Sequence, residues 1–169
     1  AELDIRVNNL ANGLLEHGVQ PGDRIALLAM NCLDYAVVAY AVAKCGCVLV
    51  PVNFRFQHGE LVYVINNSSP AVLFVGPEFA QLVSEAATDF SSNPDIVAMT
   101  GEAIGGGPTL ATLMIKGPET EPGIKVDPFS AAMIMYTSGT TGFPKGVLFS
   151  HAANLAVAQG LIIEGDMDR

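Results

Sequence analysis

The sequence predicts an α/β fold in which a largely parallel sheet carries helices on both faces. Short apolar segments with strand character alternate with helical patterns along the chain, and this alternation is typical of βαβ units. Half of the 169 residues are hydrophobic and only 15% are charged. The chain therefore has enough apolar side chains to bury a core and does not belong to the disordered class.

The first part of the chain predicts two helices around one strand. Residues 3–18 place apolar side chains on one helical face and end at Gly18, a suitable C-cap. After a Pro-Gly-Asp turn, residues 24–30 form a short apolar strand. Asn31 is the expected N-cap of a helix over 33–44, which is apolar nearly all round, as expected of a helix buried between layers.

The middle of the chain continues this alternation. Each apolar run is bounded by Gly, Pro, Asn or Ser residues that favour turns. We expect strands at 48–52, 71–75 and 95–99, and helices at 57–66 and 77–88.

Loops rich in Gly and Pro indicate how the chain is divided. We expect a layered α/β subdomain over residues 1–116, a linker over 117–128, and a strand pair with the start of a helix over 129–169. The loop at 101–108 contains three consecutive glycines, but it lacks the G-x-G-x-x-G spacing of dinucleotide-binding loops and follows no clear strand. We interpret it as a surface loop.

The most distinctive segment is 136–147, Tyr-Thr-Ser-Gly-Thr-Thr-Gly-Phe-Pro-Lys-Gly-Val. It joins strands at 131–136 and 147–150, which we expect to begin a second sheet. Its glycines allow successive N–H groups to turn towards one anion. Its four hydroxyl side chains add donors, and Lys145 adds a positive charge suited to terminal phosphate oxygens. The segment therefore predicts a loop that holds the polyphosphate of a nucleotide.

Two other interpretations of this loop are less consistent with its residues. A Walker A loop has the pattern G-x-x-x-x-G-K-[ST] and leads into a helix, whereas here Phe143 and Pro144 separate Gly142 from Lys145 and a strand follows. A surface turn without a ligand does not require three glycines, four hydroxyls and a lysine. The residues favour a phosphate loop of another design.

The loop has no group suited to act as a base or a nucleophile. Residues 136–147 contain no acid, histidine or cysteine, so binding and charge neutralisation are the expected roles. His151 follows the second loop strand and is a possible base. A structural role at the start of the following helix, over residues 152–161, is the favoured interpretation of His151.

The segment 136–147 resembles the phosphate-loop signature of the adenylate-forming (AMP-binding) superfamily, Tyr-Thr-Ser-Gly-[Thr/Ser]-Thr-Gly-x-Pro-Lys-Gly-Val, and meets every fixed position. Upstream, Pro21-Gly22-Asp23-Arg24 and the Lys-x-Gly-x-x-x-x-Pro-x-Asn pattern at 44–53 also resemble the family. The resemblance covers nearly the whole chain and implies a Rossmann-like layered subdomain. Thr140 favours the acyl-CoA synthetase, or fatty-acid–CoA ligase, branch.

The resemblance implies an ATP-dependent acid–thiol ligase. Such enzymes convert a carboxylic acid, here expected to be a fatty or aryl acid, to an acyl-adenylate and then to a coenzyme A thioester, with Mg²⁺ bound to the phosphates. By resemblance, the residues that hold the phosphates are Thr137, Ser138, Gly139, Thr140, Thr141, Gly142 and Lys145. Lys145 is expected to stabilise the phosphate charge, and Thr140 to contact the phosphate-bound Mg²⁺.

Members of the family are much longer than this chain. Their adenine, ribose and acyl contacts and their main catalytic lysine lie in segments that do not occur before Arg169. We therefore expect an N-terminal fragment that is inactive alone and that self-associates through its apolar segment 152–163. The alternative is a non-catalytic module that binds ATP or polyphosphate, or a regulatory one.

Composition disfavours nucleic acids as partners and favours a location in the cytoplasm. The net charge of −9 disfavours nucleic-acid binding. The odd number of cysteines favours reduced thiols in the cytoplasm, and core packing is expected for Cys45 and Cys47. The apolar run at 35–52 is interrupted by Lys44, Gly46 and Pro51, so we expect no transmembrane segment.

Overall fold

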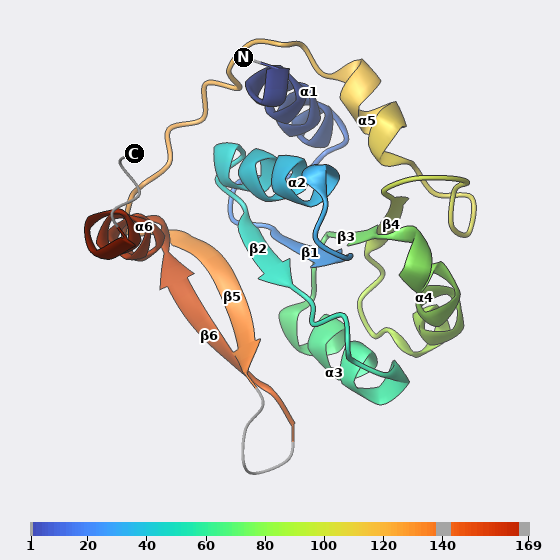
Figure 1. Cartoon of the computed structure of the whole chain (residues 1–169). Helices are drawn as coiled ribbons and strands as arrows, with labels where there is room; N and C mark the ends of the chain where they lie inside the picture. The colour runs from blue at the N-terminus through green and yellow to red at the C-terminus, as the bar shows by residue number, and fades with distance from the viewer. Residues whose placement is uncertain (1, 138–142, 166–169) are drawn as a thin grey trace.

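The computed structural model describes the backbone of residues 2–137 and 143–165, and the side chains as far as residue 161 (Figure 1). Its strands are β1 (Arg24–Leu28), β2 (Val48–Pro51), β3 (Val72–Val75), β4 (Asp95–Ala98), β5 (Ala131–Thr137) and β6 (Lys145–Ser150). Within the described ranges they form one sheet in the order β4-β3-β1-β2-β5-β6. All neighbouring pairs are parallel except β5 and β6. The predicted α/β class with a largely parallel sheet is confirmed.

Helices cover both faces of the sheet (Figure 1). One buried cluster includes residues of α1 (Glu2–Glu16), α2 (Leu33–Lys44) and α5 (Leu110–Lys116), and the other includes α3 (His58–Ser68) and α4 (Ala80–Ala86). The 3₁₀ turns η1 (Pro77–Phe79) and η2 (Ala87–Asp89) flank α4, and α6 (His151–Gly165) follows β6. In β1, Ile25 and Leu27 enter the first cluster, whereas Ala26 and Leu28 enter the second. Burial on both faces explains why the strands are continuous apolar runs.

The ends of two helices test the predicted capping residues. The N-cap of α2 is Cys32, whose side chain makes no capping bond, so the prediction of Asn31 is wrong. The helix begins at Leu33, so the N-cap is the residue directly before it, and Asn31 lies one position before the N-cap. The predicted start of α3 near Gln57 is confirmed, because Gln57 forms a capping box in which its backbone N–H donates to Glu60 Oε2 at 3.0 Å.

Helix α5 is an element that the sequence analysis did not predict. Its N-cap Thr109 accepts a hydrogen bond at Oγ1 from the backbone N–H of Thr112, at 3.2 Å. Leu110 and Leu113 are buried against the rest of the first cluster. A Cβ on Gly13 of α1 would overlap the carbonyl oxygen of Leu113, so the two helices pack with close backbone approach.

The strand pair at the end of the chain belongs to the main sheet. The predicted start of a second sheet is therefore wrong: β5 pairs in parallel with β2 through Leu49 and Met133, and β6 pairs with β5. Without β5, the edge of β2 would present unpaired backbone groups. Parallel addition of β5 pairs part of this edge and fixes the direction in which the strand pair extends.

The segment between α5 and β5 is attached to α1 and α2 by side chains. Asn8 Nδ2 donates to the carbonyl of Glu119 at 2.8 Å, and Asn12 Nδ2 donates to the carbonyls of Pro118 and Thr120 at 2.9 and 2.7 Å. These bonds hold the chain along α1 on its way to β5. The division into domains at 117–128 remains a prediction.

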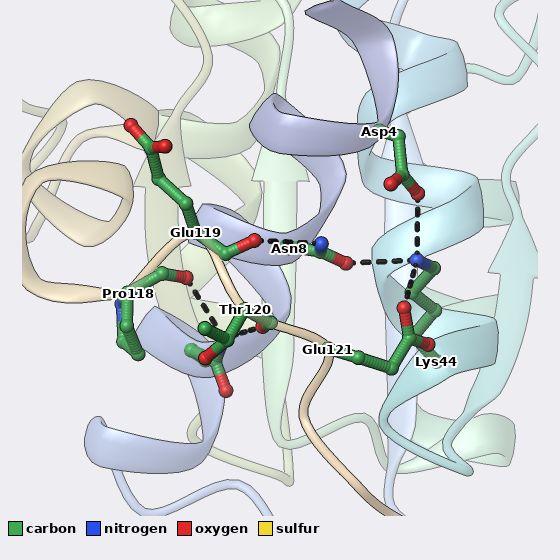
Figure 2. Close-up of polar contacts among 8 residues, drawn as sticks. Asp4, Asn8, Lys44, Pro118, Glu119, Thr120 and Glu121 are labelled. Carbon is green, nitrogen blue, oxygen red and sulfur yellow. Dashed lines mark hydrogen bonds and ion pairs between the residues drawn. The ribbon is translucent and has the colours of Figure 1, made fainter. Parts of the chain in front are cut away.

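Lys44 joins both helices to this segment (Figure 2). Its Nζ donates to Asp4 Oδ1 and Asn8 Oδ1, both at 2.8 Å, and to Glu121 Oε2 at 2.7 Å. Hydrogen bonds to Asp4 and Glu121 raise the pKa of Lys44, and the bond from Lys44 lowers the pKa of Asp4. Both shifts favour the charged forms, so the contact is an ion pair at neutral pH.

Substitution of Gly13 by alanine should destabilise the fold. The added Cβ meets the backbone of α5 rather than a flexible side chain, so we expect the free energy of unfolding to fall by about 1 to 3 kcal/mol. Gly59→Ala is the matched control, because a Cβ at Gly59 of α3 meets nothing within 4 Å. Urea unfolding of both variants measures the difference, and equal stability of the two would contradict the packing described.

Substitution of Lys44 by methionine should loosen the segment that leads to β5. We expect the initial rate of tryptic cleavage after Lys125 to rise about fivefold, because the substitution removes two ion pairs and the hydrogen bond to Asn8 at once. The rise is modest because each exposed ion pair is weak. Arg55→Met is the control, because Arg55 is exposed and forms no ion pair with the described residues. A cleavage rate that stays at the wild-type value in Lys44→Met would show that the lysine does not hold the segment.

Candidate phosphate-binding site

The candidate site lies at the loop end of the β5–β6 hairpin (Figure 1). The last two register pairs of the hairpin are Tyr136 with Gly146 and Thr137 with Lys145. Thr137 and Lys145, the two predicted site residues that the structure describes, therefore lie opposite each other across the two strands. Both are exposed. The hairpin thus brings one hydroxyl donor and one cation to the entrance and exit of the loop.

Lys145 begins β6 rather than lying in the loop. Local pattern predicts that this strand starts at residue 147, but cross-strand pairing with Thr137 extends β6 to Lys145. The preceding residue, Pro144, is buried. The backbone on the C-terminal side of the loop is therefore held by strand pairing and by packing.

Gly146 has a steric role in this hairpin. The sequence predicts that Gly146 helps to turn the chain through a positive φ, and this prediction is wrong, because Gly146 lies within β6 and its φ is not positive. A Cβ at Gly146 would lie 3.0 Å from Ile134 Cγ2 and 3.3 Å from Tyr136 Cζ. Glycine thus lets the ring of Tyr136 pack closely over the opposite strand.

The remaining predicted residues fall outside the described residues. These are Ser138, Gly139, Thr140, Thr141 and Gly142. Their phosphate contacts stay predictions, as does the contact of Thr140 with phosphate-bound Mg²⁺.

Lys145 differs from Lys44 in its surroundings. Among the residues that the structure describes, Lys145 Nζ has no hydrogen-bond or ion-pair partner, whereas Lys44 Nζ has three. In a chain with a net charge of −9, long-range attraction does not favour an anionic ligand. The exposed ammonium of Lys145 is therefore a local feature that can attract phosphate.

Helix α3 lies against both sides of the loop. The Tyr136 hydroxyl donates to Asn67 Oδ1 at 2.5 Å. The ring of Phe143 stacks on the ring of Tyr63, with centroids 4.6 Å apart and planes inclined by 20°. Burial raises the pKa of the Tyr136 hydroxyl, so this group stays protonated and able to donate at neutral pH.

His151 lies at the opposite end of β6 from Lys145. It begins α6, as predicted for a structural residue at a helix start, and its backbone N–H donates to the carbonyl of Ser130 at 3.3 Å. The strand between the two residues separates them by about 20 Å. This distance excludes direct action of His151 on a group bound beside Lys145.

The described parts of the chain also show the surroundings of two cysteines and the results of searches for metal-binding groups and membrane-spanning helices. Cys45 and Cys47 are buried, which confirms their predicted core packing. In residues 2–137 and 143–165 no group of three His, Cys, Asp or Glu side chains is arranged to hold a metal ion. None of the described helices has both the length and the apolar character needed to cross a membrane.

Comparison with known proteins identifies relatives along the whole chain. The sequence profile of the family described as AMP-binding enzyme matches residues 1–168. A Bacillus subtilis protein named as an acyl-CoA ligase, YdaB, is 35% identical over 86% of this chain and 29% of its own length. A feruloyl-CoA synthase from an Amycolatopsis species is 33% identical over 99% of this chain and 31% of its own.

A solved structure supports the same relationship. The crystal structure of a long-chain fatty-acid–CoA ligase from Archaeoglobus fulgidus superposes with a TM-score of 0.81 at 30% identity, and covers 95% of this chain and 32% of that chain. The chain thus spans less than a third of the length of these relatives.

Proposed function

Since the chain belongs to the AMP-binding enzyme family, we propose that it forms part of an enzyme that activates a carboxylic acid with ATP and transfers the acyl group to coenzyme A. The observation that carries the proposal is the pairing of Thr137 with Lys145 at the two ends of the loop. This pairing supports the proposal, because a hydroxyl and a cation lie opposite each other at the two ends of the loop. The acid is a fatty or an aryl acid, the two classes named among the relatives.

The role of the loop in this proposal is to bind the β- and γ-phosphates of ATP. The residues assigned to this role are Thr137, Ser138, Gly139, Thr140, Thr141, Gly142 and Lys145. Backbone N–H groups and hydroxyls orient the phosphate oxygens, and the Lys145 ammonium offsets their negative charge. The ligand is bound mainly by short-range donors, as the acidic chain requires.

The first half-reaction joins the acid to AMP. A carboxylate oxygen forms a bond to the α-phosphorus while the bond from that phosphorus to the pyrophosphate oxygen breaks. This exchange requires no nucleophile from the protein, which agrees with the absence of acid, histidine and cysteine residues from 136–147. Charge stabilisation and positioning by residues such as Lys145 accelerate it.

The second half-reaction forms the thioester. The thiol of coenzyme A loses its proton to solvent, its sulfur bonds to the acyl carbon, and the bond from that carbon to the AMP oxygen breaks, which releases AMP. Mg²⁺, when bound, would offset the negative charge of the pyrophosphate that leaves in the first half-reaction. The residues assigned to the loop offer hydroxyl oxygens, the hard ligands that Mg²⁺ takes. Thr140 is the residue of this chain assigned to that metal.

We expect Lys145→Ala to weaken binding of MgATP by about tenfold or more, because it removes charge-assisted bonds to phosphate. The free energy of unfolding should change little, because Lys145 is exposed. Lys116→Ala is the matched control, since it removes an exposed lysine at the end of α5. Isothermal titration calorimetry with MgATP measures the affinity, and an unchanged dissociation constant in Lys145→Ala would refute the assignment.

Activity is tested by a chimera with a relative. The 169-residue chain alone is proposed to bind MgATP without forming acyl-AMP, because it spans less than a third of its relatives. Fused in place of the matching segment of the Amycolatopsis feruloyl-CoA synthase, it should support ATP–pyrophosphate exchange with ferulate. Lys145→Ala in the chimera should reduce kcat/KM about tenfold to a thousandfold.

Two results would separate the proposal from its alternative. A folded chimera that binds MgATP but shows no exchange, while the parent enzyme is active, would favour a non-catalytic polyphosphate-binding module. Formation of acyl-AMP by the isolated 169-residue chain would contradict the view that it supplies only part of the site.

A further inference from the structure

We propose that helix α3 positions Thr137 and Lys145 by holding the residues close to them, Tyr136 and Phe143, which makes Tyr63 and Asn67 positioning residues for polyphosphate binding. This inference rests on the proposed function. Neither residue belongs to the loop or its signature. Their effect on the ligand is exerted through the loop residues that they contact.

The first contact holds the N-terminal side of the loop. The Tyr136 hydroxyl donates to Asn67 Oδ1 at 2.5 Å, and Thr137 follows directly. The same ring lies over Gly146 of the opposite strand. Tyr136 therefore joins β5 to α3 and at the same time packs on β6.

The second contact holds the C-terminal side. The ring of Phe143 lies on the ring of Tyr63 at a centroid distance of 4.6 Å, in the range favoured by aromatic pairs. Phe143 is 65% exposed, so burial in a core does not fix its position. Its stacking on Tyr63 is the aromatic contact that places it, two residues before Lys145.

Both contacts come from one face of one helix. Tyr63 and Asn67 are four residues apart, a spacing that puts side chains next to each other on a helix. The helix itself is firmly held: Leu61, Val64 and Ile65 are buried in the second cluster, and the guanidinium of Arg24 in β1 donates to the carbonyls of Ser68 and Ser69 at its end. Helix α3 can therefore act as a fixed support.

Fixing the two ends has a consequence for binding. A ligand binds more weakly when the groups that hold it must be ordered on binding, because the lost entropy opposes association. Thr137 and Lys145 lie within two residues of Tyr136 and Phe143, so the contacts from α3 restrain these two groups before the ligand arrives and increase affinity without adding a contact to the ligand. Loss of either contact should weaken binding of MgATP while Lys145 stays in place.

The contacts are tested first without a ligand. Hydrogen–deuterium exchange of the peptide over residues 143–147 should be about 2- to 10-fold faster in Tyr63→Ala and in Phe143→Ala, the range expected for one aromatic pair. The double variant should exchange no faster than the faster single variant, because both changes break the same contact. Tyr40→Ala, an exposed tyrosine on α2, should leave the rate unchanged. Additive effects in the double variant would contradict the support by α3.

Affinity is tested next by titration with MgATP. Asn67→Ala changes an exposed side chain and should weaken binding about 2- to 10-fold, as should Tyr63→Ala. Tyr63→Phe keeps the stacked ring and should restore the wild-type dissociation constant, which a general loss of stability would not do. Wild-type affinity in both alanine variants would overturn the inference.

The outcome also separates this inference from the function on which it rests. If the wild-type chain does not bind MgATP, the proposed function fails, whereas the exchange rates still decide whether α3 holds the loop ends. If the wild-type chain binds and the α3 variants bind equally well, the function stands and the positioning role fails.

Discussion

The parallel pairing of β5 with β2 determines where the candidate site lies. This pairing joins the hairpin to a sheet whose other strands are buried on both faces. It also places Thr137 at the carboxyl end of a parallel strand, the end at which open α/β sheets bind their ligands. The bonds of Lys44, Asn8 and Asn12 guide the preceding segment to β5, and α3 lies beside the loop ends. The position of the loop thus follows from the packing of elements far away in the sequence.

Two lysines of this chain differ in their surroundings. Lys44 directs its ammonium to three oxygen acceptors that belong to α1 and to the segment before β5, so its charge is used within the fold. Lys145 is exposed beside a loop of potential donors, with no partner among the described residues. Because the chain has a net charge of −9, the exposed ammonium of Lys145 can attract an anionic ligand only at short range. If the proposed site binds polyphosphate, its affinity should depend on how Thr137 and Lys145 are positioned, and the contacts from α3 lie next to both residues.

Much of the fold could be predicted from local pattern, and the exceptions depend on distant contacts. The first four strands were recognisable because each is a continuous apolar run bounded by turn-forming residues. Helix α5 was not, because it has only seven residues and its packing requires Gly13 in another helix. The single sheet could not be foreseen, because it depends on one register pair between Leu49 and Met133. The motif predicts Thr137 and Lys145 as site residues, which stays a prediction, whereas Tyr63 and Asn67 carry no local signal for their contacts with Phe143 and Tyr136.

The central claim is that the loop end of the β5–β6 hairpin binds polyphosphate. The most direct measurement is a titration of the ¹⁵N-labelled 169-residue chain with MgATP, followed through backbone amide shifts. We predict saturable shifts that are largest at Thr137, Lys145 and Gly146, with little change in β1 and α2. Shifts centred on another segment, such as the glycine loop at 101–108, or the absence of saturable shifts at the hairpin, would contradict the account.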